Sequence, residues 1–234
     1  MPRRKGRFVK SKRVKQMESA IDVERLYSIS DAVKTLKSNK HKAKFDETVD
    51  LIILLSIDPQ KADQNIRGSF SLPNGTGKKK RVIAFCEGEM AQQALAAGAV
   101  KVGGQELADE IINTNWMEFD VAIAHPSMMR FISKLGKTLG PRGLMPSPKA
   151  GTVTTEVIDA VTNFQAGMVE FRPDKRGAIQ IPIGKMSFTE EQLVQNLTTF
   201  IDHLNSLRPH TVKGRYVEKI VLTSTMGPGL KVAL

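Results

Sequence analysis

Two glycine-lysine pairs, at residues 77–78 and 136–137, could do chemistry, because such pairs occur in loops that hold nucleotide phosphates. A phosphate loop also needs a glycine five residues earlier, since its curled backbone supplies the amides that bind the phosphates. Leu72 and Phe131 stand at those two positions. Residues 87–89, Glu-Gly-Glu, follow an apolar run where a dinucleotide fold would have its glycine turn, and carboxylates repel phosphate. A nucleotide-dependent enzyme is therefore only a remote alternative.

Other titratable side chains do not form a recognisable catalytic or metal site either. Asp46, Glu47 and Asp50 stand close together, but no nucleophile or set of metal ligands accompanies them. The single cysteine, Cys86, ends an apolar run, where a small buried side chain is the ordinary interpretation. The histidines are scattered without metal-ligand spacing: His41, His125, His203 and His210. We expect a protein that is not an enzyme and has no catalytic residues, metal or cofactor.

The formal net charge of +11 is concentrated at the N-terminus. The first fifteen residues hold eight Lys or Arg and no acid, so the rest of the chain nets only +3. Such a leader can neutralise phosphates without reading sequence, or it can be a solvated tail or a targeting segment. The longest apolar run, residues 51–55, is far too short to cross a bilayer. These features predict a cytoplasmic protein with a polyanionic partner and no membrane.

Further basic residues lie in glycine-containing stretches that we expect to be loops. Residues 78–81 carry four cations, and residues 134–149 carry four more without an acid. Glycine permits close approach of the backbone to a phosphate, although a solvated face would have the same composition.

Two other segments combine the residue types that recognise RNA. Residues 42–48 contain Lys44, Phe45 and Thr48, and residues 223–227 offer hydroxyls, a methionine and backbone amides. RNA with unstacked bases is bound by such mixtures of stacking, hydroxyl contacts and close backbone packing. Burial of the phenylalanine and the methionine in a core is the alternative.

The elements that must position these residues differ in style along the chain. Outside the middle, the patterns predict helices at 30–38 and 190–207 and strands at 49–57, 66–72, 169–171, 178–183 and 216–223. Residues 173–177 suit a hairpin turn, and Thr189–Gln192 has the pattern of a capping box.

Between residues 81 and 165, short apolar runs alternate with helical stretches. We predict strands at 82–85 and 121–124 and helices at 89–97, 105–112, 127–135 and 155–164, with a Gly- and Pro-rich loop at 136–151. This order is typical of β and α elements wound around a parallel sheet. An inserted domain is the simplest arrangement of the two styles.

Five stretches, in order, resemble the bacterial form of the L-one family of large-subunit ribosomal proteins. They are KFDET at 44–48, IDP to DQNIRG at 57–68, LPNGTG at 72–77, KLGKTLGPRGLMPSP at 134–148 and STMGP at 224–228. The resemblance implies an α/β and α+β fold with two domains. These are an α+β root domain from both termini (1–75 and 166–234) and an inserted Rossmann-like α/β domain (76–165).

The same resemblance implies the partners. They are the stalk region of large-subunit ribosomal RNA, deacylated tRNA at the exit site, and the protein's own messenger RNA, which it would repress. It also implies a ribosome-associated protein, and we expect a monomer on the ribosome. A translational repressor acting mainly off the ribosome is the alternative.

Carried over to this sequence, the implied RNA-binding residues lie mainly in two segments, with two further cations nearby. The main set is Lys44, Phe45, Thr48, Ser224, Thr225, Met226 and Gly227, with Arg172 and Lys175 as the nearby cations. Possible secondary RNA contacts are Lys61, Arg67, Lys137 and Arg142. The resemblance thus favours an exposed position for the phenylalanine and the methionine.

Overall fold

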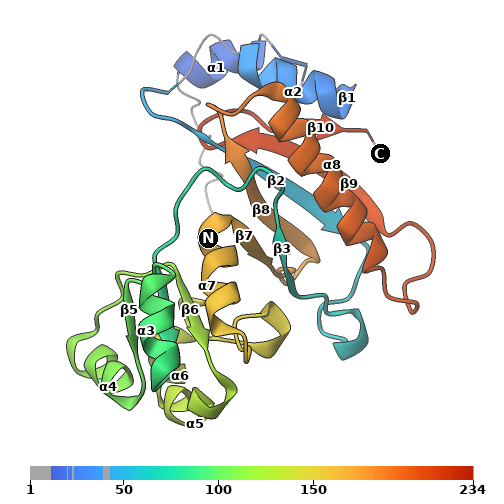
Figure 1. Cartoon of the computed structure of the whole chain (residues 1–234). Coiled ribbons are helices and arrows are strands. Elements are labelled where there is room, and N and C mark those ends of the chain that lie inside the picture. Colours follow the sequence, from blue (N-terminus) through green and yellow to red (C-terminus); the bar gives the residue numbers. More distant parts are fainter. Residues whose placement is uncertain (1–11, 20, 23, 39–42, 234) are drawn as a thin grey trace, which may run out of the picture.

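The structure, a computed structural model of the chain, describes residues 12–19, 21–22, 24–38 and 43–233. It has two parts (Figure 1): a larger part with a five-stranded sheet, and a smaller part with a three-stranded sheet. The larger, or root, part takes its elements from both ends of the sequence, and the smaller, or inserted, part lies between them. The mixture of helices and strands confirms the α/β character predicted from the sequence.

The five-stranded sheet has the order β1-β10-β9-β2-β8. These strands are Leu26–Tyr27, Leu230–Val232, Val217–Ser224, Thr48–Leu55 and Ala178–Lys185. All neighbours are antiparallel except β1 and β10. Burial alternates strictly along β2, because helices cover only one face of the sheet.

Two helices cover that face and contact one another: α2 (Ile29–Ser38) and α8 (Glu190–Ser206). The predicted capping box begins α8. The Thr189 hydroxyl accepts the N–H of Gln192 at 3.2 Å, and the Gln192 side chain accepts the N–H of Thr189 at 3.0 Å. Apolar side chains of both helices, including Leu36 and Phe200, close the core over β2 and β9. A short helix, α1 (Lys12–Ser19), precedes them.

A separate two-stranded sheet joins β3 (Gly68–Ser71) to β7 (Met168–Phe171). The hairpin predicted at 173–177 is wrong, because β7 pairs with β3 whereas β8 pairs with β2. Residues 173–177 do form a tight turn, in which the Asp174 N–H donates to the Ala178 carbonyl at 2.8 Å. The turn therefore connects two sheets instead of two neighbouring strands.

In the inserted part the strands are parallel, as the winding pattern predicted, and they have the order β5-β4-β6. They are Lys101–Gly103, Val82–Phe85 and Val121–Ala124. One apolar cluster joins the sheet to α3 (Glu89–Ala96) and α7 (Val157–Ala166). Another joins it to α4 (Gln105–Thr114), α5 (Met129–Ile132) and α6 (Gly136–Leu139).

Several expected elements differ from those observed. The helix expected at 127–135 is broken into η2 (Pro126–Met128), α5 and η3 (Ser133–Leu135), and α6 and η4 (Pro148–Ala150) interrupt the expected loop. Another short 3-10 turn, η1 (Ala62–Gln64), lies before β3. The very short strands β1, β5 and β10 escaped prediction, since two or three residues give too little alternation to detect.

The two chain segments that link the parts lie against each other at two glycines. A Cβ on Gly167 would lie 2.6 Å from the Cα of Gly75, and a Cβ on Gly75 would lie 2.7 Å from the carbonyl oxygen of Ala166. Both glycines have a positive φ, 65° at Gly75 and 122° at Gly167. Side chains would prevent this crossing. The domain boundaries at residues 75 and 166 stay a prediction.

Candidate RNA interface

The start of β2 and the end of β9 bring together the two segments that the sequence singled out. Val49 pairs with Ser224 at the last ladder position. Beyond it, the Thr48 N–H donates to the Thr225 hydroxyl at 3.0 Å, and the Thr225 N–H donates to the Thr48 carbonyl at 3.0 Å. Residues 44–48 and 224–227 therefore lie side by side on the root part.

A tight turn follows β9. The Gly227 N–H donates to the Ser224 carbonyl at 3.0 Å, and the Thr223 hydroxyl lies 3.4 Å from the Gly227 carbonyl. A Cβ on Gly227 would come within 2.3 Å of the Ser224 hydroxyl oxygen, so a larger residue would force the Ser224 side chain to rotate. Ser224 itself is buried, which makes it a support for this turn and leaves little of it for a ligand to touch.

Phe45 and Met226 are exposed, although a core position was the alternative from the sequence alone. Phe45 is 56% exposed and Met226 is 49% exposed. Lys44 and Thr225 beside them are also exposed, and Thr48 and Gly227 are half-buried. We call these six residues, Lys44, Phe45, Thr48, Thr225, Met226 and Gly227, the strand-end face.

Lys185 brings a cation to this face that the sequence did not indicate. It ends β8, opposite Thr48, and its ammonium lies 2.9 Å from the Thr48 hydroxyl. Burial raises the pKa of nearby Asp50, and the charge of Lys185 opposes that rise. Only the register of β2 against β8 places Lys185 here, and sequence spacing carries no sign of that register.

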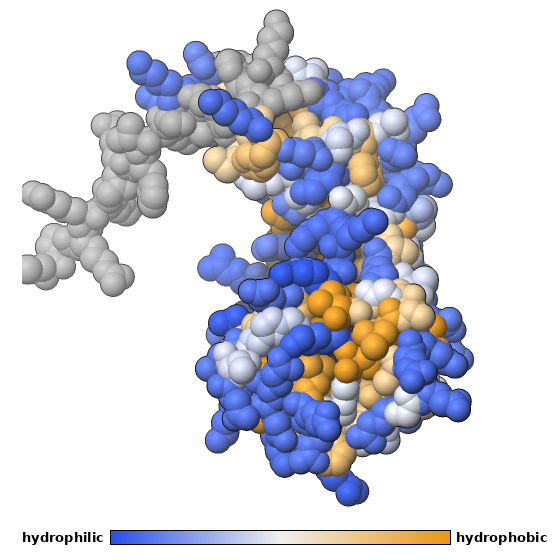
Figure 2. Space-filling view, turned by 60° about the vertical axis from the view of Figure 1, so that its left-hand side comes forward, coloured by the Kyte–Doolittle hydropathy of each residue, from blue (hydrophilic) through white to orange (hydrophobic). Residues whose placement is uncertain are grey.

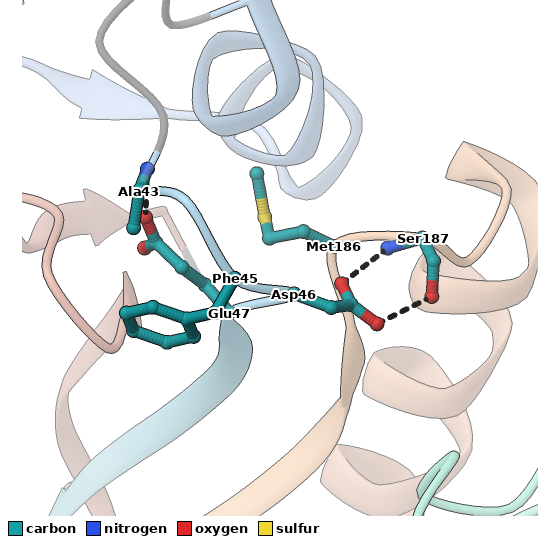
Figure 3. A pocket seen from close by; sticks show the side chains of 6 residues that line it. All are labelled: Ala43, Phe45, Asp46, Glu47, Met186 and Ser187. Atoms are coloured by element: carbon teal, nitrogen blue, oxygen red, sulfur yellow. Dashed lines mark hydrogen bonds between the residues drawn. The ribbon is translucent and has the colours of Figure 1, made fainter.

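A small pocket of about 230 Å³ lies next to the strand-end face, between residues 43–47 and 186–187 (Figure 3). Asp46 closes one side. One of its carboxylate oxygens accepts the N–H of Ser187 at 3.1 Å, and the other accepts the Ser187 hydroxyl at 2.9 Å. The ring of Phe45 points away from this bonded pair. The pocket therefore has an apolar side and a carboxylate side.

Arg172 and Lys175 lie elsewhere, so the expectation that they are close to the main RNA-binding residues is wrong. In the pairing of β2 with β8, Lys185 stands opposite Thr48, whereas Ala178, just after the turn, stands opposite Leu54. At about 3.3 Å per residue, the two ends of the sheet are separated by roughly 20 Å. Because Arg172 and Lys175 come just before β8 begins, they lie at the end of the sheet opposite the strand-end face.

There, Arg172 and Lys175 meet Arg67, one of the possible secondary contacts. The three cations line a hollow of about 670 Å³ together with Pro59, Gln60, Asn65, Pro173 and Asp174. We call Arg67, Arg172 and Lys175 the turn face. Lys61 is on the same loop as Arg67, exposed, with its ammonium 3.8 Å from an Asp58 carboxylate oxygen.

Asp174 holds the turn that carries Lys175. One of its carboxylate oxygens accepts the N–H of Arg176 at 2.8 Å and the N–H of Ala178 at 2.9 Å. These bonds from the backbone amides of Ala178 and Arg176 lower the pKa of Asp174. The Asp174 carboxylate thus accepts hydrogen bonds from the turn backbone, although it lies beside the cations of the hollow.

Lys137 and Arg142 lie in the inserted part, in α6 and just after it, and both are exposed. They belong to neither face of the root part. The expected phosphate-binding leader falls mostly outside the described residues, which begin with α1 at Lys12.

The inserted part is a poor match for a nucleotide where a dinucleotide fold would bind one. A hollow of about 540 Å³ beyond β4 and β5 is lined by Glu87, Glu106 and Asp109. A carboxylate oxygen of Glu87 lies 2.3 Å from where a Cβ of Gly104 would be, before the first turn of α4. A phosphate would meet these carboxylates.

Hydrophobic side chains also gather over the inserted part on the side seen in Figure 2. Its exposed large apolar residues are Met90, Leu95, Val100 and Ile112. These apolar side chains offer a phosphate backbone no charge to pair with.

Among the described residues, no group of three or more His, Cys, Asp or Glu could hold a metal ion. No helix in the described part of the chain is long and apolar enough to span a bilayer.

Comparison with known proteins gives consistent matches. A model of the "Ribosomal protein L1p/L10e family" matches residues 36–228. The protein named "Large ribosomal subunit protein uL1" of Fervidobacterium nodosum is 50% identical over 224 residues, which cover 96% of this chain and 95% of the relative. Proteins of the same name from Kosmotoga olearia (47% identical, 99% and 97% covered) and Thermosipho africanus (49% identical, 95% of each covered) are similar.

Proposed function

The chain belongs to the ribosomal protein L1p/L10e family, and from this we propose that it binds the stalk region of large-subunit ribosomal RNA through its strand-end face. Membership of a family of ribosomal proteins confirms the prediction of an RNA-binding protein instead of an enzyme. Its relatives are named as proteins of the large ribosomal subunit. We assign the same particle to this chain, and with it a cytoplasmic location.

One observation carries the assignment of the site: two large apolar side chains, Phe45 and Met226, stand exposed beside hydroxyls and amides at two joined strand ends. An exposed aromatic ring can stack on an unpaired base or pack on a ribose, and methionine follows an irregular surface. Lys44 and Lys185 add positive charge for phosphates. The hydrogen-bonded strand ends hold this mixture rigidly, which lowers the entropy lost on binding.

We assign a different RNA to the turn face, namely the deacylated tRNA at the exit site. Arg67, Arg172 and Lys175 face a broad hollow without an exposed aromatic side chain among its lining residues. This composition suits contact with a phosphate backbone more than readout of bases. Lys61, Lys137 and Arg142 are candidates for additional contacts with the same RNA, which the protein would hold and release as the stalk moves.

Repression of the protein's own messenger would use the strand-end face again. A messenger segment that mimics the stalk RNA would compete for the same residues, so free protein would be withdrawn whenever stalk RNA is abundant. A translational repressor that acts mainly off the ribosome is the second candidate function.

We propose that the root domain, residues 1–75 and 166–234, binds the stalk RNA and the messenger, and that residues 76–165 form the inserted domain. We also propose that the protein is a monomer on the ribosome.

Filter binding and sedimentation test the proposal together. The protein should bind a transcript of the stalk helix tightly and sediment with large ribosomal subunits, and Phe45→Ala should weaken both. Loss of one stacked base corresponds to about 1–3 kcal/mol. A control in the inserted part is Leu95→Ala, which removes another large apolar side chain that is 51% exposed and should leave RNA affinity unchanged. Tight binding to its messenger without association with subunits would support the off-ribosome repressor instead.

A further inference from the structure

A buried carboxylate lies directly behind the strand-end face. Glu47 is only 5% exposed, although acidic residues are rarely buried and a negative charge beside an RNA site repels phosphate. Nothing in the sequence assigned a role to it beyond its membership of the acidic group at residues 46–50. The hydrogen bonds of the buried carboxylate explain why a negative charge is found at this position.

Its two carboxylate oxygens accept hydrogen bonds from two different chain segments. One accepts the N–H of Ala43 at 2.9 Å, before Phe45, and the other accepts the N–H of Met226 at 3.2 Å, in the turn after β9. In addition, the backbone carbonyl of Glu47 accepts the N–H of Met186 at 2.9 Å, beyond β8. One residue thus connects the three segments that surround the face.

We propose that Glu47 is the positioning residue of the RNA interface: its carboxylate fixes Met226 and the segment before Phe45, and it does so without touching RNA. This inference rests on the proposed function of the strand-end face. Because the carboxylate is buried and its oxygens accept amide N–H groups, its charge is compensated locally and is screened from phosphates by the residues it holds.

A carboxylate is needed because the two amides approach two different oxygens. Glutamine has one oxygen acceptor, and its second terminal atom is a donor. In Glu47→Gln, one of the two amides would therefore face an NH₂ group. The chain would keep its shape and its core, but one side of the face would lose its anchor.

Asp46 provides a separate anchor on the other side of the strand. Figure 3 shows the Glu47 carboxylate directed to Ala43 and the Asp46 carboxylate directed to Ser187. Successive side chains of an extended segment point to opposite sides. The two acids therefore hold different segments: Asp46 binds the residues before β2 to the turn after β8, and Glu47 holds the strand-end face.

The experiment measures affinity for a transcript of the stalk helix with the full-length protein carrying Glu47→Gln, Met226→Ala or both. We expect Glu47→Gln to weaken binding at least tenfold and to lower the melting temperature only by a few degrees, because one buried amide loses its acceptor while the core stays intact. If Glu47 acts through Met226, the double variant should bind scarcely more weakly than the worse single variant. Unchanged affinity in Glu47→Gln would overturn the proposal, and fully additive losses would overturn its claim that Glu47 acts through Met226.

Asp174→Ala is the matched control, because Asp174 also holds a turn through two backbone amides but at the turn face. It should leave stalk-RNA affinity unchanged. If it weakens stalk binding as much as Glu47→Gln does, the assignment of the two faces fails while the role of Glu47 does not. Should Glu47→Gln unfold, hydrogen exchange of the wild-type protein decides: a Met226 amide exchanging as fast as a free peptide would contradict the anchor.

Discussion

Thr48 and Thr225 exchange two hydrogen bonds, one of them through a side chain, one position beyond the last ladder pair of β2 and β9. The Thr225 N–H donates to the Thr48 carbonyl at 3.0 Å, and the Thr48 N–H donates to the Thr225 hydroxyl, also at 3.0 Å. A side-chain oxygen thus replaces a backbone carbonyl at the point where the chain turns away. This bond lets the turn with Met226 and Gly227 leave the sheet while both strand ends stay aligned.

Thr225→Val should remove this side-chain acceptor and keep the shape of the residue. The Thr48 N–H would lose its partner at a partly exposed position, at a cost of about 1 kcal/mol. Because the strand ends would separate more easily, stalk-RNA affinity should fall several-fold. Thr198→Val, which removes a hydroxyl bonded to the Val194 carbonyl in α8, is the control and should leave affinity unchanged. Equal affinity in both variants would contradict the role of Thr225.

Met226→Asp should weaken specific binding severely and spare the fold. The side chain is 49% exposed, so a carboxylate there stays hydrated, and its charge repels phosphates at the centre of the face. We expect a loss of more than tenfold in stalk affinity and a change in stability within about 0.5 kcal/mol. Melting and binding should be measured on the same preparation. A variant that melts much earlier yet binds normally when folded would place Met226 in the core.

Arg172→Ala combined with Lys175→Ala should weaken binding of tRNA and leave the stalk transcript unaffected. Each phosphate contact that is lost should reduce the dependence of log affinity on log salt by roughly 0.7 to 0.9. The measurement is a salt titration of both RNAs with both proteins. A reduced slope for the stalk transcript alone would assign the turn face to the stalk.

Tyr216→Phe should be neutral or stabilising. Tyr216 is buried, and its hydroxyl has no hydrogen-bond partner among the described residues. Burial raises its pKa to about 12, against the opposing charge of Arg208. Removing an unsatisfied hydroxyl with no change of shape relieves its desolvation cost. Thermal melting should show an equal or higher midpoint, and a clearly lower midpoint would reveal a partner for the hydroxyl.

Strongly patterned elements could be predicted from the sequence, and the strands of two or three residues could not. The strands at 82–85 and 121–124 and the capped helix after Thr189 are confirmed because apolar runs and capping residues mark them locally. The hairpin at 173–177 was wrong because its turn residues are correct locally, while the partners of the flanking strands are distant in sequence. The local sequence specifies the turn, but it does not specify which strands pair on either side of it.

The same limit applies to the candidate site. Residues 44–48 and 224–227 could be singled out by residue type, and their contact is observed. The separation of Arg172 and Lys175 from them, the arrival of Lys185 and the burial of Glu47 all depend on strand register. The apolar alternation fixes which face of β2 is buried, but a shift of two residues would keep that face, and no feature of a single sequence excludes such a shift between strands 130 residues or more apart.

The most direct test of the account is the affinity of a shortened chain for the stalk transcript. Residues 1–75 joined to residues 166–234 would keep the five-stranded sheet and the strand-end face, and the junction is feasible because Gly75 and Ala166 lie in contact. This folded, shortened chain should retain most of the binding free energy of the full-length protein. Affinity reduced to the level of non-specific RNA, with the fold intact by circular dichroism, would contradict this prediction and place the binding site in residues 76–165.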